Sequence, residues 1–126
     1  MNLRVHVRHL KSDIANLQHQ VVEKENPFAN TINSVSYALG VMYVIEGSTL
    51  GGQVICKMLT KLLPSLQENQ LAYFASYGEK TFPMWSSFKS SIDTLTDTID
   101  ENEMTAGAKD TFESLRLWLL KEAVTQ

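Results

Sequence analysis

The stretch of sequence that decides the fold is residues 38–55, ALGVMYVIEGSTLGGQVI, an apolar helix-like run interrupted by four glycines. A glycine inside a helix costs about 0.5–1 kcal/mol relative to alanine, so this number of glycines needs a reason. Gly40, Gly47 and Gly51 are seven and four residues apart and therefore share one helix face. Such a face lets another helix or a flat ligand approach the backbone closely, and Gly51-Gly52 gives the helix a place to bend. Spacing alone leaves both interpretations open.

The segments on either side of this run also have helical patterns. In a first helix, apolar residues recur at alternating steps of four and three and form one stripe: Leu3, Val7, Leu10, Ile14, Leu17 and Val21. The polar residues 23–27 end this helix. The glycine-containing helix is expected from about residue 33 to residue 63, where Pro64 stops it.

Turn signals divide the rest of the chain into three further helices. Ser65-Leu66-Gln67-Glu68 has the form of a capping box and predicts a third helix, which Gly78 closes. Thr81 and Pro83 predict the start of a fourth helix. The fifth helix is expected to bury one apolar face, made of Ala108, Phe112, Leu115 and Leu119. No segment shows the period-two alternation of a strand, so the sequence predicts a single all-α domain over residues 1–126.

Composition and charge exclude several classes of protein. The chain carries 11 Lys and Arg against 14 Asp and Glu, without a basic cluster that could follow a phosphate backbone, so no nucleic-acid partner is expected. The single Cys56 fits a reducing compartment. The N-terminus lacks the pattern of a signal peptide, and the charge-free stretch Asn26–Ile45 is too polar for a membrane span. We therefore expect a cytoplasmic protein that does not enter the membrane.

Residues 38–55 resemble the distal-helix signature of bacterial heme oxygenases, including those that supply biliverdin to phytochromes. The run Tyr-Val-x-Glu-Gly-Ser-Thr-Leu-Gly-Gly is long and specific. Further similarities follow in the family's order, at Tyr73-Phe74, Tyr77-Gly78, Trp85-x-x-Phe88 and Phe112-x-x-Leu115-x-x-Trp118-Leu119. The resemblance covers nearly the whole chain but only the later portion of the family's domain. It implies a heme oxygenase-like helical bundle without the N-terminal helices.

The resemblance also implies a chemistry. Heme oxygenases open heme to biliverdin and release carbon monoxide and iron, with heme as both substrate and cofactor and electrons from an external reductase or ferredoxin. A helix without side chains over the iron leaves room for oxygen and ordered water. By the same resemblance, Gly47 and Gly51 lie closest to the heme, Gly52 lies at the bend, and Tyr43 belongs to the same heme-binding set.

Two further residues are assigned by resemblance. Animal members of the family have a proton-delivering aspartate where this chain has Ser48, a residue shared with bacterial relatives. A hydroxyl can position water but cannot act as an acid near neutral pH, so Ser48 is the candidate catalytic residue through water positioning. Lys89, just after Phe88, falls near the place where the family has a basic residue for the heme propionates. The competing interpretation of Lys89 is a solvated surface lysine.

The family's axial histidine sits on a helix before the region matched here. His6, His9 and His19 do not occupy the motif position, so none is assigned as a metal ligand, and all three are expected on the surface. Three explanations stay open: a piece of a heme oxygenase, a relative that acts as an interaction module, or a chain whose partner supplies the missing helix.

The sequence therefore favours a heme oxygenase, or a relative that binds heme weakly because the histidine-bearing helix is missing. The alternative is a non-catalytic helical binding or assembly module. Either way, the apolar stripe of the first helix has lost the helices that would cover it. We expect the chain to self-associate as a homo-oligomer through this stripe.

Overall fold

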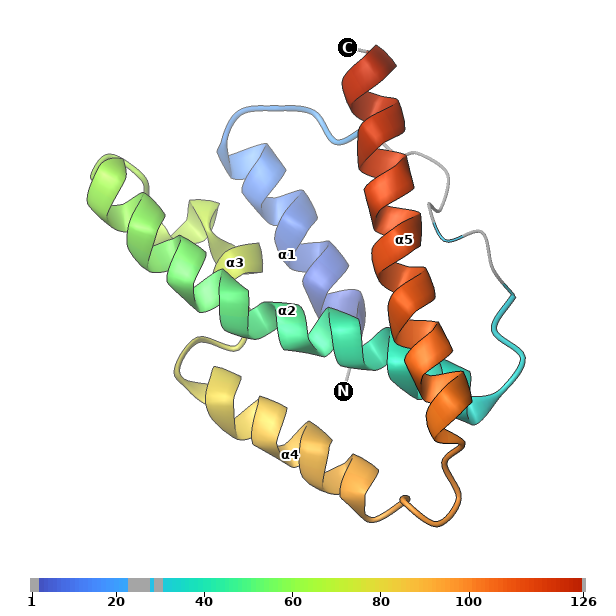
Figure 1. The fold of residues 1–126 in the computed structure, drawn as a ribbon. Coiled ribbons are helices and arrows are strands. Elements are labelled where there is room, and N and C mark those ends of the chain that lie inside the picture. The colour runs from blue at the N-terminus through green and yellow to red at the C-terminus, as the bar shows by residue number, and fades with distance from the viewer. Residues whose placement is uncertain (1–2, 23–27, 29–30, 126) are drawn as a thin grey trace. The chain divides into compact units, whose positions relative to one another are not determined.

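The computed structural model describes residues 3–22, 28 and 31–125 (Figure 1). Every regular element in these ranges is helical, which confirms the predicted all-α class. The elements in chain order are α1 (Leu3–Asn16), α2 (Val35–Leu62), the 3₁₀ turn η1 (Glu68–Gln70), α3 (Ala72–Ala75), the 3₁₀ turn η2 (Gly78–Lys80), α4 (Thr81–Asp93) and α5 (Glu101–Thr125).

The chain divides into two compact units. Unit 1 comprises Met1–Glu23 and Gly47–Phe88, and unit 2 comprises Lys24–Glu46 and Lys89–Gln126. Helices α2 and α4 each contribute residues to both units. Whether residues 1–126 behave as one domain stays a prediction, and each unit is described by itself.

In unit 1, α1 ends earlier than its apolar pattern predicts. The helix stops at Asn16, and Gln18 adopts a positive φ of 64°. The amide of His19 then donates to the carbonyl of Ile14 at 3.0 Å, which is the bond that closes a helix with a left-handed residue after its end. Glycine usually occupies that position, so the sequence carried no signal for this end.

Helix α1 packs against η1 and α3 through its polar side. The carboxylate of Asp13 is 5% exposed and accepts the amides of Ala72 and Tyr73, each at 2.7 Å. His6 is also buried, with its ring edge-on to Tyr77 at a centroid distance of 5.5 Å, so the prediction of a surface histidine was wrong for this residue. This packing leaves part of the apolar stripe exposed: Val7, Leu10 and Leu17, referred to below as the α1 stripe.

The predicted third helix is replaced by η1, the single turn α3 and η2. The capping bond runs from the amide of Gln67 to Oε1 of Gln70 at 2.9 Å, two residues later than the Ser65 box predicted. Asp13 fixes the start of α3 from another helix, and Ser76, with a φ of 51°, ends it. A tertiary contact therefore overrides the local capping signal.

In unit 2, α2 and α5 cross at two glycines. A Cβ at Gly40 would overlap the carbonyl oxygen of Met104, and a Cβ at Gly107 would overlap that of Tyr37. The hydroxyl of Tyr37 donates to Asp110 at 2.6 Å and ties the helices together beside this crossing. Gly40 is thus explained by close helix packing.

The apolar face of α5 is not buried as predicted. Phe112, Leu115 and Leu119 are 63%, 47% and 53% exposed. The physical reason is that α5 meets α2 through the turn around Gly107, so the apolar residues of the later turns lie away from the contact.

By length and composition alone, α2 could cross a membrane. This is weak evidence, because the central helix of a soluble protein meets the same criterion. The expectation of a protein that does not enter the membrane therefore stays a prediction.

Candidate functional site

Gly47 lies under an aromatic ring of unit 1. A Cβ placed on it would stand 3.5 and 3.7 Å from two carbons of the Trp85 ring, which is ordinary van der Waals contact. Phe88, 7% exposed, holds Trp85 in place at a ring-centroid distance of 5.7 Å. The bare backbone at Gly47 is therefore covered by a side chain of this chain itself.

Gly51 is different, because its backbone is open. It is exposed, and no described atom outside the adjacent backbone of its own helix lies within 4 Å of a Cβ placed on it. Exposed residues continue along α2 at alternating steps of three and four and form a surface that we call the open α2 face: Ser48, Gly51, Ile55, Met58 and Leu62. Its apolar members Ile55, Met58 and Leu62 are 39%, 55% and 69% exposed.

Gly52 serves packing within unit 1. A Cβ there would lie 2.5 Å from the carbonyl oxygen of Phe74, so α2 can approach this segment only with glycine. The neighbouring Gln53 amide donates to the carbonyl of Ala75 at 2.7 Å and to Oγ1 of Thr81 at 3.0 Å. Helix α2 continues without interruption through Gly51 and Gly52.

Two residues assigned by resemblance come together in unit 2. Tyr43 and Lys89 line one cavity of about 220 Å³, together with Ile92, Asp93 and Met104. Tyr43 is 43% exposed. The predicted residues thus form two groups, with Gly47, Ser48, Gly51 and Gly52 in unit 1 and Tyr43 and Lys89 in unit 2.

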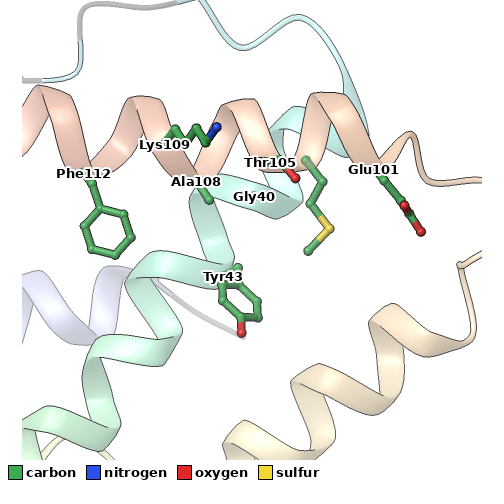
Figure 2. A pocket seen from close by; sticks show the side chains of 8 residues that line it. Gly40, Tyr43, Glu101, Thr105, Ala108, Lys109 and Phe112 are labelled. Atoms are coloured by element: carbon green, nitrogen blue, oxygen red, sulfur yellow. The ribbon is translucent and has the colours of Figure 1, made fainter.

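A second cavity in unit 2 was not predicted from the sequence. It has a volume of about 390 Å³ and lies between α2 and α5, as Figure 2 shows. We call it the α2–α5 groove; it is lined by Gly40, Tyr43, Glu101, Met104, Thr105, Ala108, Lys109 and Phe112. The spacing of Thr105, Ala108 and Phe112 is a signal for one helix face, but not for the open space beside it.

The titratable groups that the structure describes supply no metal centre. Among the residues that the structure describes, no group of three or more His, Cys, Asp or Glu side chains could hold a metal ion. Nδ1 of His9 is buried and has no hydrogen-bond partner in the described chain. Burial raises the pKa of the Cys56 thiol, and the negative charge of Asp13 raises it further, so the thiol stays protonated and unreactive near neutral pH.

The open α2 face matches the needs of one side of a flat apolar macrocycle. The missing side chain at Gly51 lets a planar ligand reach the backbone, and the apolar residues that follow can cover its surface. The hydroxyl of Ser48 lies at the end of this face. The residues present therefore fit one side of a heme.

Comparison with known proteins gives one match. A family model described as heme oxygenase matches residues 9–121, which is most of the chain. Comparisons with curated proteins and with solved structures found no match.

Proposed function

Because the chain belongs to the heme oxygenase family, we propose that it binds heme on the open α2 face and serves in the oxidative opening of heme to biliverdin, carbon monoxide and iron. The observation that carries this proposal is the open backbone at Gly51, in a helix whose other three glycines are covered: Gly40 and Gly52 by backbone of other segments and Gly47 by Trp85. When bound, heme supplies the oxygen chemistry, and the protein supplies binding and orientation.

The residues of α2 have separate roles in this proposal. Gly51 lets the ring approach the helix backbone, and Ile55 and Met58 cover its apolar surface. Ser48 holds a water molecule rather than donating a proton itself, since a hydroxyl is not an acid near neutral pH. Gly47 keeps a supporting role, because its bare side allows Trp85 to pack against α2.

Lys89 and Tyr43, both in unit 2, are proposed from the family resemblance alone as residues that bind the heme propionates. They share one cavity, in which the lysine ammonium can pair with a propionate and the tyrosine hydroxyl can donate to it. Asp93 lines the same cavity and limits the net positive charge there. Electrons would come from an external reductase or ferredoxin, and the site of action would be the cytoplasm.

The test is a leucine at Gly51. Because the position is open, Gly51→Leu leaves the fold intact, while its side chain occupies the space where the ring would lie. Thr60→Leu is the matched control: it adds the same side chain nine residues later, on the opposite side of α2 and also exposed. Hemin is titrated into each protein, and the absorbance change and urea unfolding are both measured.

We expect Gly51→Leu to lose most of its hemin affinity at unchanged stability, and Thr60→Leu to bind like the wild type. Equal hemin binding by all three proteins would refute the heme role of the open α2 face. If Gly51→Leu loses stability in the absence of hemin, the face is a packing surface.

A second candidate function is favoured by the exposed apolar residues. The α1 stripe in unit 1 and Phe112, Leu115 and Leu119 in unit 2 leave apolar surface in water. Such surfaces suit a non-catalytic assembly module that forms a homo-oligomer. This function requires oligomers whose formation is independent of hemin, whereas the heme oxygenase proposal requires hemin binding.

A further inference from the structure

We infer that Met58 is a site of reversible oxidation by hydrogen peroxide, and that its sulfoxide lowers the affinity of the open α2 face for heme. This inference deepens the function proposed above and rests on it. It is carried by two observations, the exposure of the Met58 side chain and its position on α2 relative to Gly51. Both residues belong to unit 1.

Met58 differs from the other described methionines in its contact with solvent. It is 55% exposed. The other methionines whose side chains the structure describes are half-buried: Met42, Met84 and Met104. A peroxide molecule must reach the sulfur atom to oxidise it, so Met58 reacts before the others.

Met58 lies on the same line of α2 as the open backbone. Seven residues separate it from Gly51, and seven residues turn a helix by about 700°, within about 20° of two full turns. Side chains on a helix lean toward its N-terminus, so the thioether of Met58 lies over the turn that leads back to Gly51. A macrocycle that rests on Gly51 and extends along the open α2 face therefore meets this side chain.

The chemistry is a two-electron oxidation of the thioether. The sulfur of Met58 attacks one oxygen of hydrogen peroxide, the O–O bond breaks, an S–O bond forms and water leaves. The sulfur loses the two electrons that the peroxide gains. The proposed function brings oxygen and electrons to this face, and oxygen that takes up two electrons and two protons without attacking the heme is hydrogen peroxide.

Oxidation changes the surface that the ring would cover. The thioether is apolar and polarizable, like its neighbours Ile55 and Leu62 on the same face, whereas the sulfoxide oxygen is a strong hydrogen-bond acceptor. Water satisfies this oxygen on the empty face, and a bound ring removes that water. The affinity for hemin should then fall by about tenfold. Sulfoxide reductases reverse the change, so peroxide suppresses heme uptake only until the methionine is reduced.

The test combines peptide mapping with hemin titration. The chain without hemin is treated with hydrogen peroxide, the excess is removed, and the oxidation of each methionine is measured by mass spectrometry of its proteolytic peptides. Hemin is then titrated into the treated and untreated chains. We expect Met58 to gain one oxygen before the half-buried methionines do, the hemin affinity to fall by about tenfold, and methionine sulfoxide reductases to restore it.

Three variants separate Met58 from general damage. Met58→Leu keeps the volume and apolar character of the side chain but cannot form a sulfoxide, so it should bind hemin equally well before and after peroxide. Met84→Leu is the matched control at a half-buried methionine of unit 1 and should lose affinity as the wild type does. Met58→Gln adds a polar group without any oxidant and should bind hemin weakly from the start.

The outcomes distinguish this inference from the proposed function. An untreated chain that binds no hemin would refute both. Where the untreated chain binds hemin, the inference alone is overturned by earlier oxidation of another methionine, by full affinity of a chain oxidised at Met58, or by equal losses in treated Met58→Leu and wild type. Urea unfolding should be unchanged by the treatment, because Met58 is exposed, and a loss of affinity that accompanies unfolding would also overturn the inference.

Discussion

Alanine at Gly40 and alanine at Gly51 should change stability in opposite directions. Both substitutions add one methyl group to the interior of α2. At Gly51 the methyl group meets no described atom outside the adjacent backbone of its own helix within 4 Å, so only the helix-propensity gain remains, about 0.5–1 kcal/mol in favour of the folded state. At Gly40 the methyl group would overlap the carbonyl of Met104 and stand 2.8 Å from the amide nitrogen of Ala108.

The cost at Gly40 follows from these distances. Ordinary contact begins at 3.4 Å, so the Ala108 nitrogen must retreat by at least 3.4 − 2.8 = 0.6 Å. The obstacle is helix backbone, so α2 and α5 must separate along their crossing, and overpacking of this kind costs about 1–3 kcal/mol. The propensity gain is common to both variants and cancels in their difference, which should equal this overpacking cost.

The assay is urea unfolding of the two variants, followed by far-UV circular dichroism and extrapolated to water. Gly40→Ala should unfold at lower urea than the wild type and Gly51→Ala at higher urea. Equal midpoints for the two variants would refute the assignment of Gly40 to a backbone contact.

Three further predictions concern unit 1. Asp13→Ala removes two charge-assisted hydrogen bonds to amides that water can partly reach. It should lower the free energy of unfolding by about 3 kcal/mol, the sum of two such bonds at the low end of their range. Asp97→Ala, at an exposed position, should change the free energy of unfolding in urea by under about 0.5 kcal/mol, and equal effects of the two substitutions would contradict the capping role of Asp13. The raised pKa of Cys56 disfavours its thiolate in the folded chain, so the pH profile of iodoacetamide alkylation should lie at higher pH for the folded chain than for the chain unfolded in urea. The free energy of unfolding should fall as the pH rises through the range in which the thiol ionises. Coincident alkylation profiles of the folded and unfolded chains would contradict this. Self-association through the α1 stripe predicts a dimer of the wild type in light scattering behind a sizing column, and a shift toward monomer for both Val7→Glu and Leu10→Glu. A monomeric wild type would remove the α1 stripe as an interface.

The helices with local signals could be predicted from the sequence. Pro64 and the apolar run before it place α2 within two residues of its observed bounds, Val35–Leu62. Thr81 and Pro83 place the start of α4. In both cases the deciding interaction lies within a few residues along the chain, where propensity and proline geometry act directly.

The segment after α2 could not be predicted, because its structure depends on a distant residue. Ser65 and Glu68 provide a capping signal, but Asp13 binds the amides of Ala72 and Tyr73 and starts the helix there instead. The end of α1 is similar, since Gln18 adopts a left-handed conformation that sequence patterns associate with glycine.

The candidate site was predictable in composition but not in detail. Spacing correctly places Gly40, Gly47 and Gly51 on one side of a helix. It cannot tell them apart, because what covers each glycine comes from later in the chain: α5 for Gly40 and Trp85 for Gly47. Only the structure singles out Gly51 as open.

The single turn of α3 has a consequence for the order of folding. A helix of four residues cannot nucleate by itself, because isolated helices shorter than about 12–15 residues are marginal in water. Its first amides are held by Asp13, 59 and 60 positions earlier in the chain, so the turn forms only after that long loop has closed. Helix α2, built from local contacts, can form first and offer the surface at Gly52 and Gln53 against which the α3 segment packs. The contacts of Asp13 therefore belong to the late side of the folding transition state, where losing them speeds unfolding more than it slows folding.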